Sequence, residues 1–225
     1  MWQKSQGQKE RARAIIKILQ SATHGMVEPA AISIIKQYGR DPFLILISCI
    51  LSLRTKDSVS LAASQRLFSH AKTPQQLLAI PDKTIEKLIY PTGFYRQKTK
   101  QILALCAKLV EKYQGCVPST ETALLQLPGV GPKTAALVLS LGFEIPAICV
   151  DTHVHRVSNR LGLVKSKTVQ ETEQQLKELL PKKYWSEFNS LMVMWGQNIC
   201  VPISPKCSIC PLLPLCPQIG VTRRR

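Results

Sequence analysis

Apolar side chains recur along most of this chain at three- and four-residue spacing, which is the period of an α-helix. No stretch alternates between apolar and polar positions in the way that a half-buried strand does. The pattern therefore predicts an all-α fold with short connections. Capping residues then indicate where individual helices begin and end.

Two helices are marked most clearly. Asp41-Pro42 is a helix start, since Asp caps an N-terminus and Pro is preset for the first helical position. The apolar run that follows predicts a buried helix that ends near Leu53. A second apolar stripe runs from Lys98 to Tyr113 and is closed by Gly115. Its members are Ile102, Leu105, Cys106, Leu109 and Tyr113.

The second half of the chain carries the same signals. Ser119 is expected to cap a helix that stops at Leu127-Pro128-Gly129. Later helices are expected to begin at Pro132 and near Asp151, and to cover Val169–Leu180 and Trp185–Trp195.

The charge balance points to a polyanionic partner. Thirty Lys and Arg against fourteen Asp and Glu give a net charge of +16 in 225 residues. A field of this strength attracts nucleic acid, whose phosphates release counterions when they are neutralised. Phe43–Leu53 is too short to span a bilayer, and the basic N-terminus does not resemble a secretion signal. We therefore expect a cytoplasmic protein, associated with the nucleoid if it is bacterial.

The eight cysteines fall into two groups. Four lie singly in apolar or mixed surroundings and are expected to be core residues: Cys49, Cys106, Cys116 and Cys149. The other four crowd together and indicate a metal site: Cys200, Cys207, Cys210 and Cys216. Four thiolates suit either zinc or an iron–sulfur cluster, although structural zinc sites usually show two closely spaced pairs.

The segment Leu127–Ala135 contains two glycines around one apolar residue. Gly129 and Gly131 allow a tight turn, and Val130 would anchor that turn in the core. A helix that starts at Pro132 presents unpaired N–H groups, which together with its dipole form a phosphate site. The alternative is a simple corner between two helices.

Lys133 and Asp151 are the candidate reactive pair. Lys133 lies in the first helical turn after the hairpin, where the helix dipole and any apolar enclosure disfavour the protonated amine. A neutral amine is a nucleophile that forms Schiff bases, whereas a charged one would only contact phosphate. Asp151 could cap the next helix, accept a proton from Lys133, or do both.

These motifs resemble the helix-hairpin-helix DNA glycosylases, specifically their endonuclease III branch. The resemblance rests on Leu127–Ala135 with Val150–His153, on Leu51–Asp57, on Leu88–Arg96 and on the four clustered cysteines. It implies two helical domains with a DNA-binding cleft between them. The domains would be residues 35–145, with the hairpin, and residues 1–34 with 146–225, including a cluster loop at 200–216.

The resemblance also implies an activity and a cofactor. The protein would be a monomeric, bifunctional DNA glycosylase and AP lyase that acts on oxidised pyrimidines and abasic sites in duplex DNA. Lys133 would attack the sugar and Asp151 would assist, and β-elimination through a Schiff base would cut the strand. The four clustered cysteines would hold a [4Fe–4S] cluster with a structural role, presenting Lys206 to DNA.

Further residues are expected to contact DNA. An enzyme that reaches the sugar of a stacked nucleotide must flip it out and fill the gap. The resemblance assigns that task to Arg54, where most relatives have glutamine, and to Phe94, for which core packing is the alternative. The remaining expected contacts are Gly129, Val130, Gly131, Thr134, His153, Arg156 and Arg160, where a solvated basic face is the alternative for the two arginines.

Overall fold

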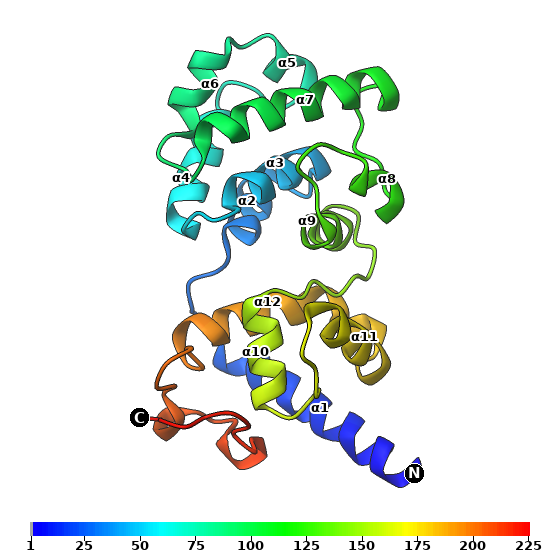
Figure 1. Ribbon diagram of the computed structural model, residues 1–225, viewed down its shortest axis with the longest axis vertical. Coiled ribbons are helices and arrows are strands. Elements are labelled where there is room, and N and C mark those ends of the chain that lie inside the picture. Colours follow the sequence, from blue (N-terminus) through cyan, green and yellow to red (C-terminus); the bar gives the residue numbers. More distant parts are fainter. Residues whose placement is uncertain (1) are drawn as a thin grey trace. The chain divides into compact units, whose positions relative to one another are not determined.

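The structure is a computed structural model that describes the backbone of residues 2–225 and the side chains from residue 6 onward. Helices and turns make up this range, and no strand occurs within it (Figure 1). The prediction of an all-α fold is therefore confirmed. None of the helices in the described range is long and apolar enough to cross a lipid bilayer.

The chain divides into two compact units. Unit 1 combines Met1–Glu28 with Pro146–Arg225, and unit 2 is Pro29–Ile145. The boundary expected after residue 34 would cut the continuous helix Ala30–Tyr38, which lies whole in unit 2.

Unit 2 is built around one helix that is buried almost completely. This helix, α3 (Pro42–Ser52), is buried from Phe43 to Leu51. Asp41 caps it as predicted, because its Oδ1 accepts from the backbone N–H of Phe43 at 2.8 Å and of Leu44 at 3.1 Å. The other helices of unit 2 are α2 (Ala30–Tyr38), α4 (Asp57–Phe68), α5 (Pro74–Leu78), α6 (Asp82–Ile89), α7 (Tyr95–Tyr113), α8 (Glu121–Leu125) and α9 (Pro132–Leu137), which continues as a π-helical turn, Val138–Gly142.

The long helix α7 follows the predicted stripe. Ile102, Leu105, Cys106 and Leu109 are fully buried along it, and Gly115 adopts the left-handed conformation expected of a helix end (φ 82°).

Two details of the sequence interpretation were wrong. Thr120, and not Ser119, caps α8, because its side chain accepts from the N–H of Ala123. Cys116 is exposed rather than in the core, since it lies in the connection after α7 and not on a packed helix face.

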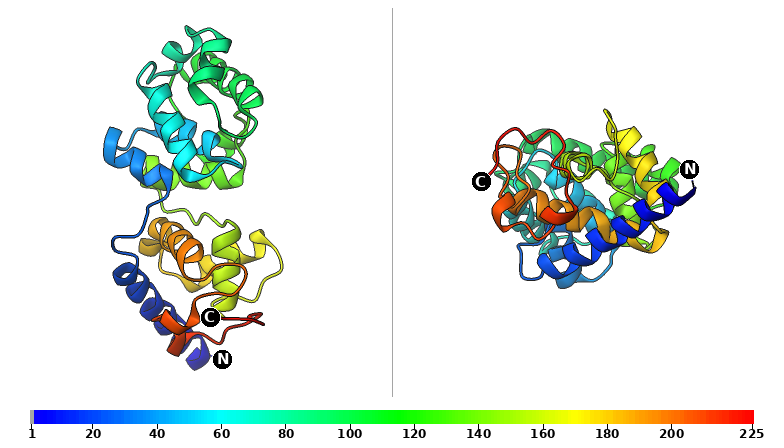
Figure 2. Two further views of the ribbon diagram at one scale, coloured as in Figure 1. Left: turned by 90° about the vertical axis from the view of Figure 1, so that its left-hand side faces the viewer. Right: turned by 90° about the horizontal axis from the view of Figure 1, so that it is seen from below.

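Unit 1 packs four helices around a core that contains Phe188 and Trp195. The helices are α1 (Trp2–Ala22), α10 (Thr152–Arg160), α11 (Val169–Leu179) and α12 (Trp185–Asn198), followed by the single 3-10 turns Cys207–Ile209 and Leu213–Leu215. Figure 2 shows α1, from the start of the chain, beside elements from its end. Burial of each large apolar side chain contributes about 1.5–3 kcal/mol, so α1 is an integral part of this core.

Candidate active site and nucleic-acid interface

The hairpin between α8 and α9 has the geometry that its glycines predict. Gly129 has φ +77°, a left-handed conformation that side chains rarely adopt. Val130 is 8% exposed and anchors the turn in the core, as expected. Gly131 is the N-cap of α9, with open space where a Cβ would lie. Thr134 is buried within unit 2, at 3% exposure.

Lys133 is exposed in the first turn of α9. Its charge acts on Cys49 of α3. Burial raises the pKa of the Cys49 thiol to about 12, and the positive charge of Lys133 opposes that rise. The amine therefore lies beside α3 on the surface of unit 2. Unit 2 therefore leaves Lys133 exposed rather than enclosed in an apolar pocket.

Asp151 caps α10 in unit 1. Its Oδ1 accepts from the backbone N–H groups of both His153 and Val154 at 2.9 Å, so the predicted capping role is confirmed. Val150, immediately before it, is buried and fixes the entry to the helix. Both capping bonds use the same carboxylate oxygen. Lys133 belongs to unit 2 and Asp151 to unit 1.

Arg54 and Phe94 come together on the surface of unit 2. The Cζ atom of Arg54 lies 5.6 Å from the centroid of the Phe94 ring, within the range of a cation–π contact. Phe94 is 60% exposed, which rules out core packing as its role. The backbone of both residues adopts the left-handed conformation, with φ 52° for Arg54 and 57° for Phe94. Exposed residues with a strained backbone of this kind concentrate at functional sites.

Three residues beneath this pair were missed by the sequence reasoning. They are Thr55, Gly93 and Lys98, which form a hydrogen-bonded group between the two turns. A signal existed for Lys98, because it precedes Ile102 by four residues and therefore lies on the apolar stripe of α7. A lysine on a buried face needs specific partners.

The basic residues of α10 contact the loop that carries the clustered cysteines. The guanidinium of Arg156 donates to the carbonyls of Gly196 at 3.0 Å and Cys200 at 3.1 Å. Arg160 donates to the carbonyls of Val201 at 2.7 Å and Pro202 at 2.6 Å. Both arginines therefore hold the loop to α10, and a phosphate contact by either one stays a prediction.

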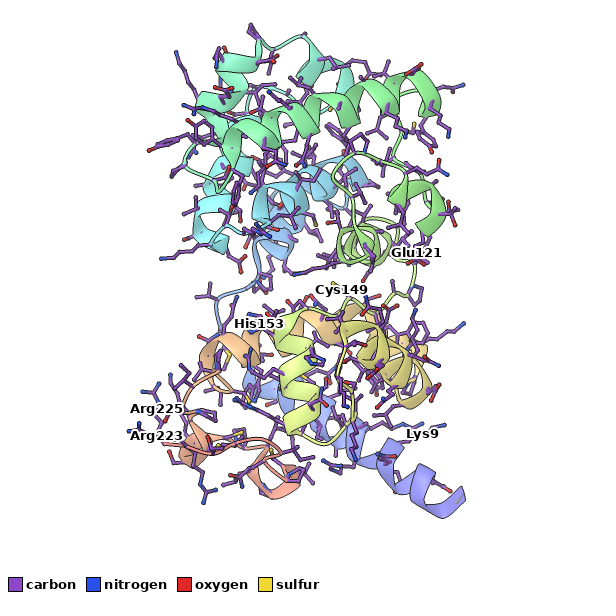
Figure 3. The ribbon with its side chains drawn as sticks, viewed as in Figure 1. Lys9, Glu121, Cys149, His153, Arg223 and Arg225 are labelled. Atoms are coloured by element: carbon purple, nitrogen blue, oxygen red, sulfur yellow. The ribbon has the colours of Figure 1, made fainter. Side chains whose placement is uncertain are left out.

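His153 lies in the first turn of α10 (Figure 3). Its Nδ1 lies 3.2 Å from Nη2 of Arg156. The close approach of α12 makes this packing tight, because a Cβ at Gly196 would lie 2.7 Å from the His153 ring. The ring is thus fixed against two helices of unit 1.

The four clustered cysteines line one hollow. Its wall also includes Arg160, Trp195 and Lys206. Cys207 is buried and the other three are half-buried. Burial raises the pKa of the Cys210 and Cys216 thiols, and interaction with the other cysteines raises both further.

The spacing of these thiols bears on the kind of metal. Among the residues that the structure describes, no three His, Cys, Asp or Glu side chains converge on a point where one ion could bind. In a cubane each thiolate binds a different iron, so its four ligands need a shared hollow rather than a common centre. The four thiolates around one hollow therefore fit an iron–sulfur cluster as their ligand set.

Arg11 was also missed by the sequence reasoning. From α1 it donates to the carbonyls of Leu161, Gly162 and Leu215, the last at 3.2 Å from Nε and 3.1 Å from Nη2. The segment after Val221 returns to the same loop, since Arg225 N–H donates to Pro205 O and Ser208 N–H donates to Arg225 O. Figure 3 shows Arg223 and Arg225 beside this loop. Residues near both ends of the chain thus form hydrogen bonds with the segments around the hollow.

Known proteins resemble this chain over most of its length. The family described as HhH-GPD superfamily base excision DNA repair protein matches residues 47–182. Endonuclease III of Thermotoga maritima is 48% identical over 190 residues, covering 82% of this chain and 89% of that protein. Endonuclease III-like protein 1 of Mus musculus is 44% identical over 178 residues, covering 78% of this chain and 59% of that protein.

The fold comparison agrees. A solved structure of a trapped endonuclease III–DNA covalent intermediate has a TM-score of 0.80 and 37% sequence identity, and covers 93% of this chain and 96% of that one. The family match includes the glycine hairpin, Lys133 and Asp151. This chain therefore belongs to the endonuclease III family of HhH-GPD base excision DNA repair proteins.

Proposed function

We propose that this DNA glycosylase and AP lyase of base excision repair removes oxidised pyrimidines from duplex DNA through Lys133 and Asp151. The observation that carries the proposal is the exposed lysine in the first turn of the hairpin helix, in a chain of this family. We also propose that it acts in the cytoplasm, in association with the nucleoid if the protein is bacterial.

The proposed reaction begins with the flipped nucleotide. The neutral amine of Lys133 attacks C1′ as the bond from C1′ to the base breaks, and the departing base takes up a proton. Asp151 accepts a proton from the amine that has formed the new bond. Opening of the sugar ring then leaves a Schiff base between Nζ of Lys133 and C1′.

Strand cleavage follows from this intermediate. The imine acidifies the C2′ proton, and its removal expels the 3′ phosphate by β-elimination. Water then hydrolyses the imine and returns the free lysine. A non-covalent mechanism with activated water would release the base but leave the strand intact.

DNA would be gripped by charge and by the hairpin. The net charge of +16 supplies long-range attraction. The backbone N–H groups at Gly129 and Gly131 would offer donors to a phosphate oxygen, whereas the N–H of Val130 donates to the carbonyl of Leu127 at 3.2 Å within the turn. The exposed pair Arg54 and Phe94 would fill the gap that the flipped nucleotide leaves.

A [4Fe–4S] cluster would be held by Cys200, Cys207, Cys210 and Cys216. When bound, it would supply structural cross-linking of the loop and no step of the reaction. The arginines of α10 and Arg11 already hold the segments around the hollow. The cluster loop would then present Lys206, which lines the hollow, toward the DNA backbone.

The decisive experiment is borohydride trapping. Protein is mixed with duplex DNA that carries one abasic site, with and without sodium borohydride. We expect strand cleavage without reductant, and with it a stable protein–DNA adduct whose modified peptide contains Lys133. Release of a damaged base with no adduct and no cut would instead establish the monofunctional reaction.

A further inference from the structure

A buried lysine lies beneath the surface pair Arg54 and Phe94. Lys98 is 3% exposed. Its ammonium donates to the carbonyl of Leu51 at 2.7 Å, to the carbonyl of Leu53 at 2.8 Å and to the hydroxyl of Thr55 at 2.9 Å. An ammonium has three N–H donors, so these partners account for all of them.

The acceptors identify what this ammonium organises. Leu51 belongs to the last turn of α3, where carbonyls lack partners within the helix and a positive charge is favourable. Leu53 and Thr55 flank Arg54 on its two sides. Lys98 therefore fixes the chain immediately before and immediately after Arg54.

The same group also fixes Phe94. The N–H of Gly93 donates to Oγ1 of Thr55 at 3.0 Å, and the backbone N–H of Lys98 donates to the carbonyl of Phe94 at 2.9 Å. Oγ1 of Thr55 in turn donates to the carbonyl of Leu53 at 3.3 Å. The Thr55 hydroxyl thus joins the two turns, and the Lys98 ammonium reaches the second turn through that hydroxyl.

These hydrogen bonds stabilise an unfavourable backbone conformation at Arg54 and Phe94. A left-handed conformation is unfavourable for a residue with a side chain, and such strain persists only where surrounding contacts enforce it. Arg54 and Phe94 are both in that conformation and both exposed, so neither is held by burial of its own side chain. The contacts that enforce their backbone lie below them, at Lys98 and Thr55.

We infer that Lys98 is a positioning residue for nucleotide flipping, holding Arg54 and Phe94 in the arrangement that enters the DNA stack. The inference rests on the proposed function. Lys98 does not touch DNA, because it is buried and its three donors are occupied. Its effect should fall on the step in which a paired base leaves the helix, and not on elimination at a sugar that has already lost its base.

The test compares Lys98→Met with Lys100→Met. Methionine has nearly the length of lysine but no donor, and Lys100 is an exposed lysine on the same helix that provides the matched control. Single-turnover rates are measured for base release from a duplex with one oxidised pyrimidine, and for cleavage of a single strand with a preformed abasic site.

For Lys98→Met we expect base release to slow by about 10- to 100-fold, the range typical of a displaced positioning group, with cleavage of the abasic strand within about threefold of wild type. Lys100→Met should match wild type on both substrates. Equal loss on both substrates would mean a general structural role, and unchanged base release would mean no role at all. Either result overturns the inference.

A second pair of variants guards against misfolding of the first. Thr55→Val removes the hydroxyl that joins the turns, whereas Thr55→Ser keeps it. Flipping is followed by the fluorescence of 2-aminopurine placed next to the lesion, which rises when stacking is lost. We expect the fluorescence rise to be smaller for Thr55→Val than for wild type, and to equal that of wild type for Thr55→Ser. An equal rise in the two variants would contradict the inference.

The wild-type protein tests the proposed function, and the Lys98→Met variant tests the role of Lys98. A wild-type protein that neither releases the base nor cuts the abasic strand would refute the proposed function, and with it the role of Lys98. A wild-type protein that does both, alongside a Lys98→Met variant that is equally active, refutes the role of Lys98 alone.

Discussion

The guanidinium of Arg54 lies over the ring of Phe94, with Cζ 5.6 Å from the ring centroid, although the two residues come from separate turns of unit 2. The first turn follows α3 and the second precedes α7. Each side chain reaches solvent while its backbone is held from below. An aromatic ring and a planar cation in contact form a surface on which a nucleobase can stack.

Removal of the aromatic ring should weaken flipping. Phe94→Ala is expected to slow base release from duplex DNA by about tenfold, since one stacking contact contributes about 1–3 kcal/mol. Leu78→Ala, at another exposed apolar residue of unit 2, should leave the rate unchanged. Single-turnover kinetics on one lesion duplex measure both. Equal rates for the two variants would remove Phe94 from the flipping step.

Arg54 should influence which base is tolerated opposite the lesion. Its guanidinium can donate hydrogen bonds to the unpaired base but cannot accept any, whereas glutamine can do both. Arg54→Gln should therefore change the ratio of base-release rates for lesions opposite G and opposite A by at least about threefold. The four opposite bases are compared in otherwise identical duplexes, and an unchanged ratio would show that Arg54 does not read this base.

Lys133 should be indispensable for covalent chemistry. Lys133→Gln is expected to abolish the borohydride-trapped adduct and to slow strand cleavage by at least about a thousandfold, because no other group replaces the nucleophile. Lys87→Gln, at an exposed lysine of α6, is the matched control and should retain both. Full cleavage by Lys133→Gln would assign the nucleophile to a different residue.

Gly93 and Gly131 should respond differently to alanine. A Cβ at Gly93 would lie 2.6 Å from the backbone oxygen of Arg54, so the two turns would have to separate. We expect Gly93→Ala to lower the free energy of unfolding by about 1–3 kcal/mol, as overpacking does. A Cβ at Gly131 would lie in open space, so Gly131→Ala should leave the free energy of unfolding unchanged. Urea unfolding of the two variants checks this, and equal stability would place the Gly93 turn elsewhere.

The buried ammonium predicts a pH dependence of stability. Burial lowers the pKa of Lys98 from its ordinary 10.5 to about 8. Between these values the unfolded chain binds more protons than the folded one, so the contribution of Lys98 to the free energy of unfolding rises with pH. Below pH 8 the charge is present in both states and its burial opposes folding at a constant level.

Comparison of wild type with Lys98→Met isolates this contribution. The thiols of Cys49 and Cys106, whose pKa values burial raises to about 12, act with the opposite sign but equally in both proteins. The stability of wild type relative to the variant should therefore increase from pH 8 to pH 10. Parallel curves across that range would mean that Lys98 titrates as it does in the unfolded chain.

The cysteine hollow makes a prediction about metal content. Cys207→Ser should remove most of the bound iron and sulfide and lower the melting temperature, because a structural metal contributes directly to folding. Cys116→Ser, at an exposed cysteine outside the cluster, should retain both. Iron, sulfide and zinc are assayed in anaerobically purified protein. Wild-type protein that contains zinc and no iron would overturn the [4Fe–4S] assignment.

The sequence by itself determined the features that depend on neighbours along the chain. A continuous apolar run after a cap predicted α3, and helical spacing of apolar residues predicted α7. Asp41 and Asp151 were recognisable as caps because a cap bonds to N–H groups two and three residues later. The same locality explains the small errors. Ser119 and Thr120 are adjacent and chemically alike, and only the turn of the backbone selects Thr120.

Only the tertiary structure decided the partnerships between distant residues. No spacing rule connects Lys98 with Leu51, or Arg54 with Phe94, since contacts over such separations depend on how α3 and α7 pack. Arg156 and Arg160 were recognisable as one face of a helix, but the sequence could not show that the cysteine loop occupies their donors. Local chemistry follows from the order of residues, whereas the use of each donor follows from packing, because a buried polar group is costly unless the surrounding structure supplies a partner.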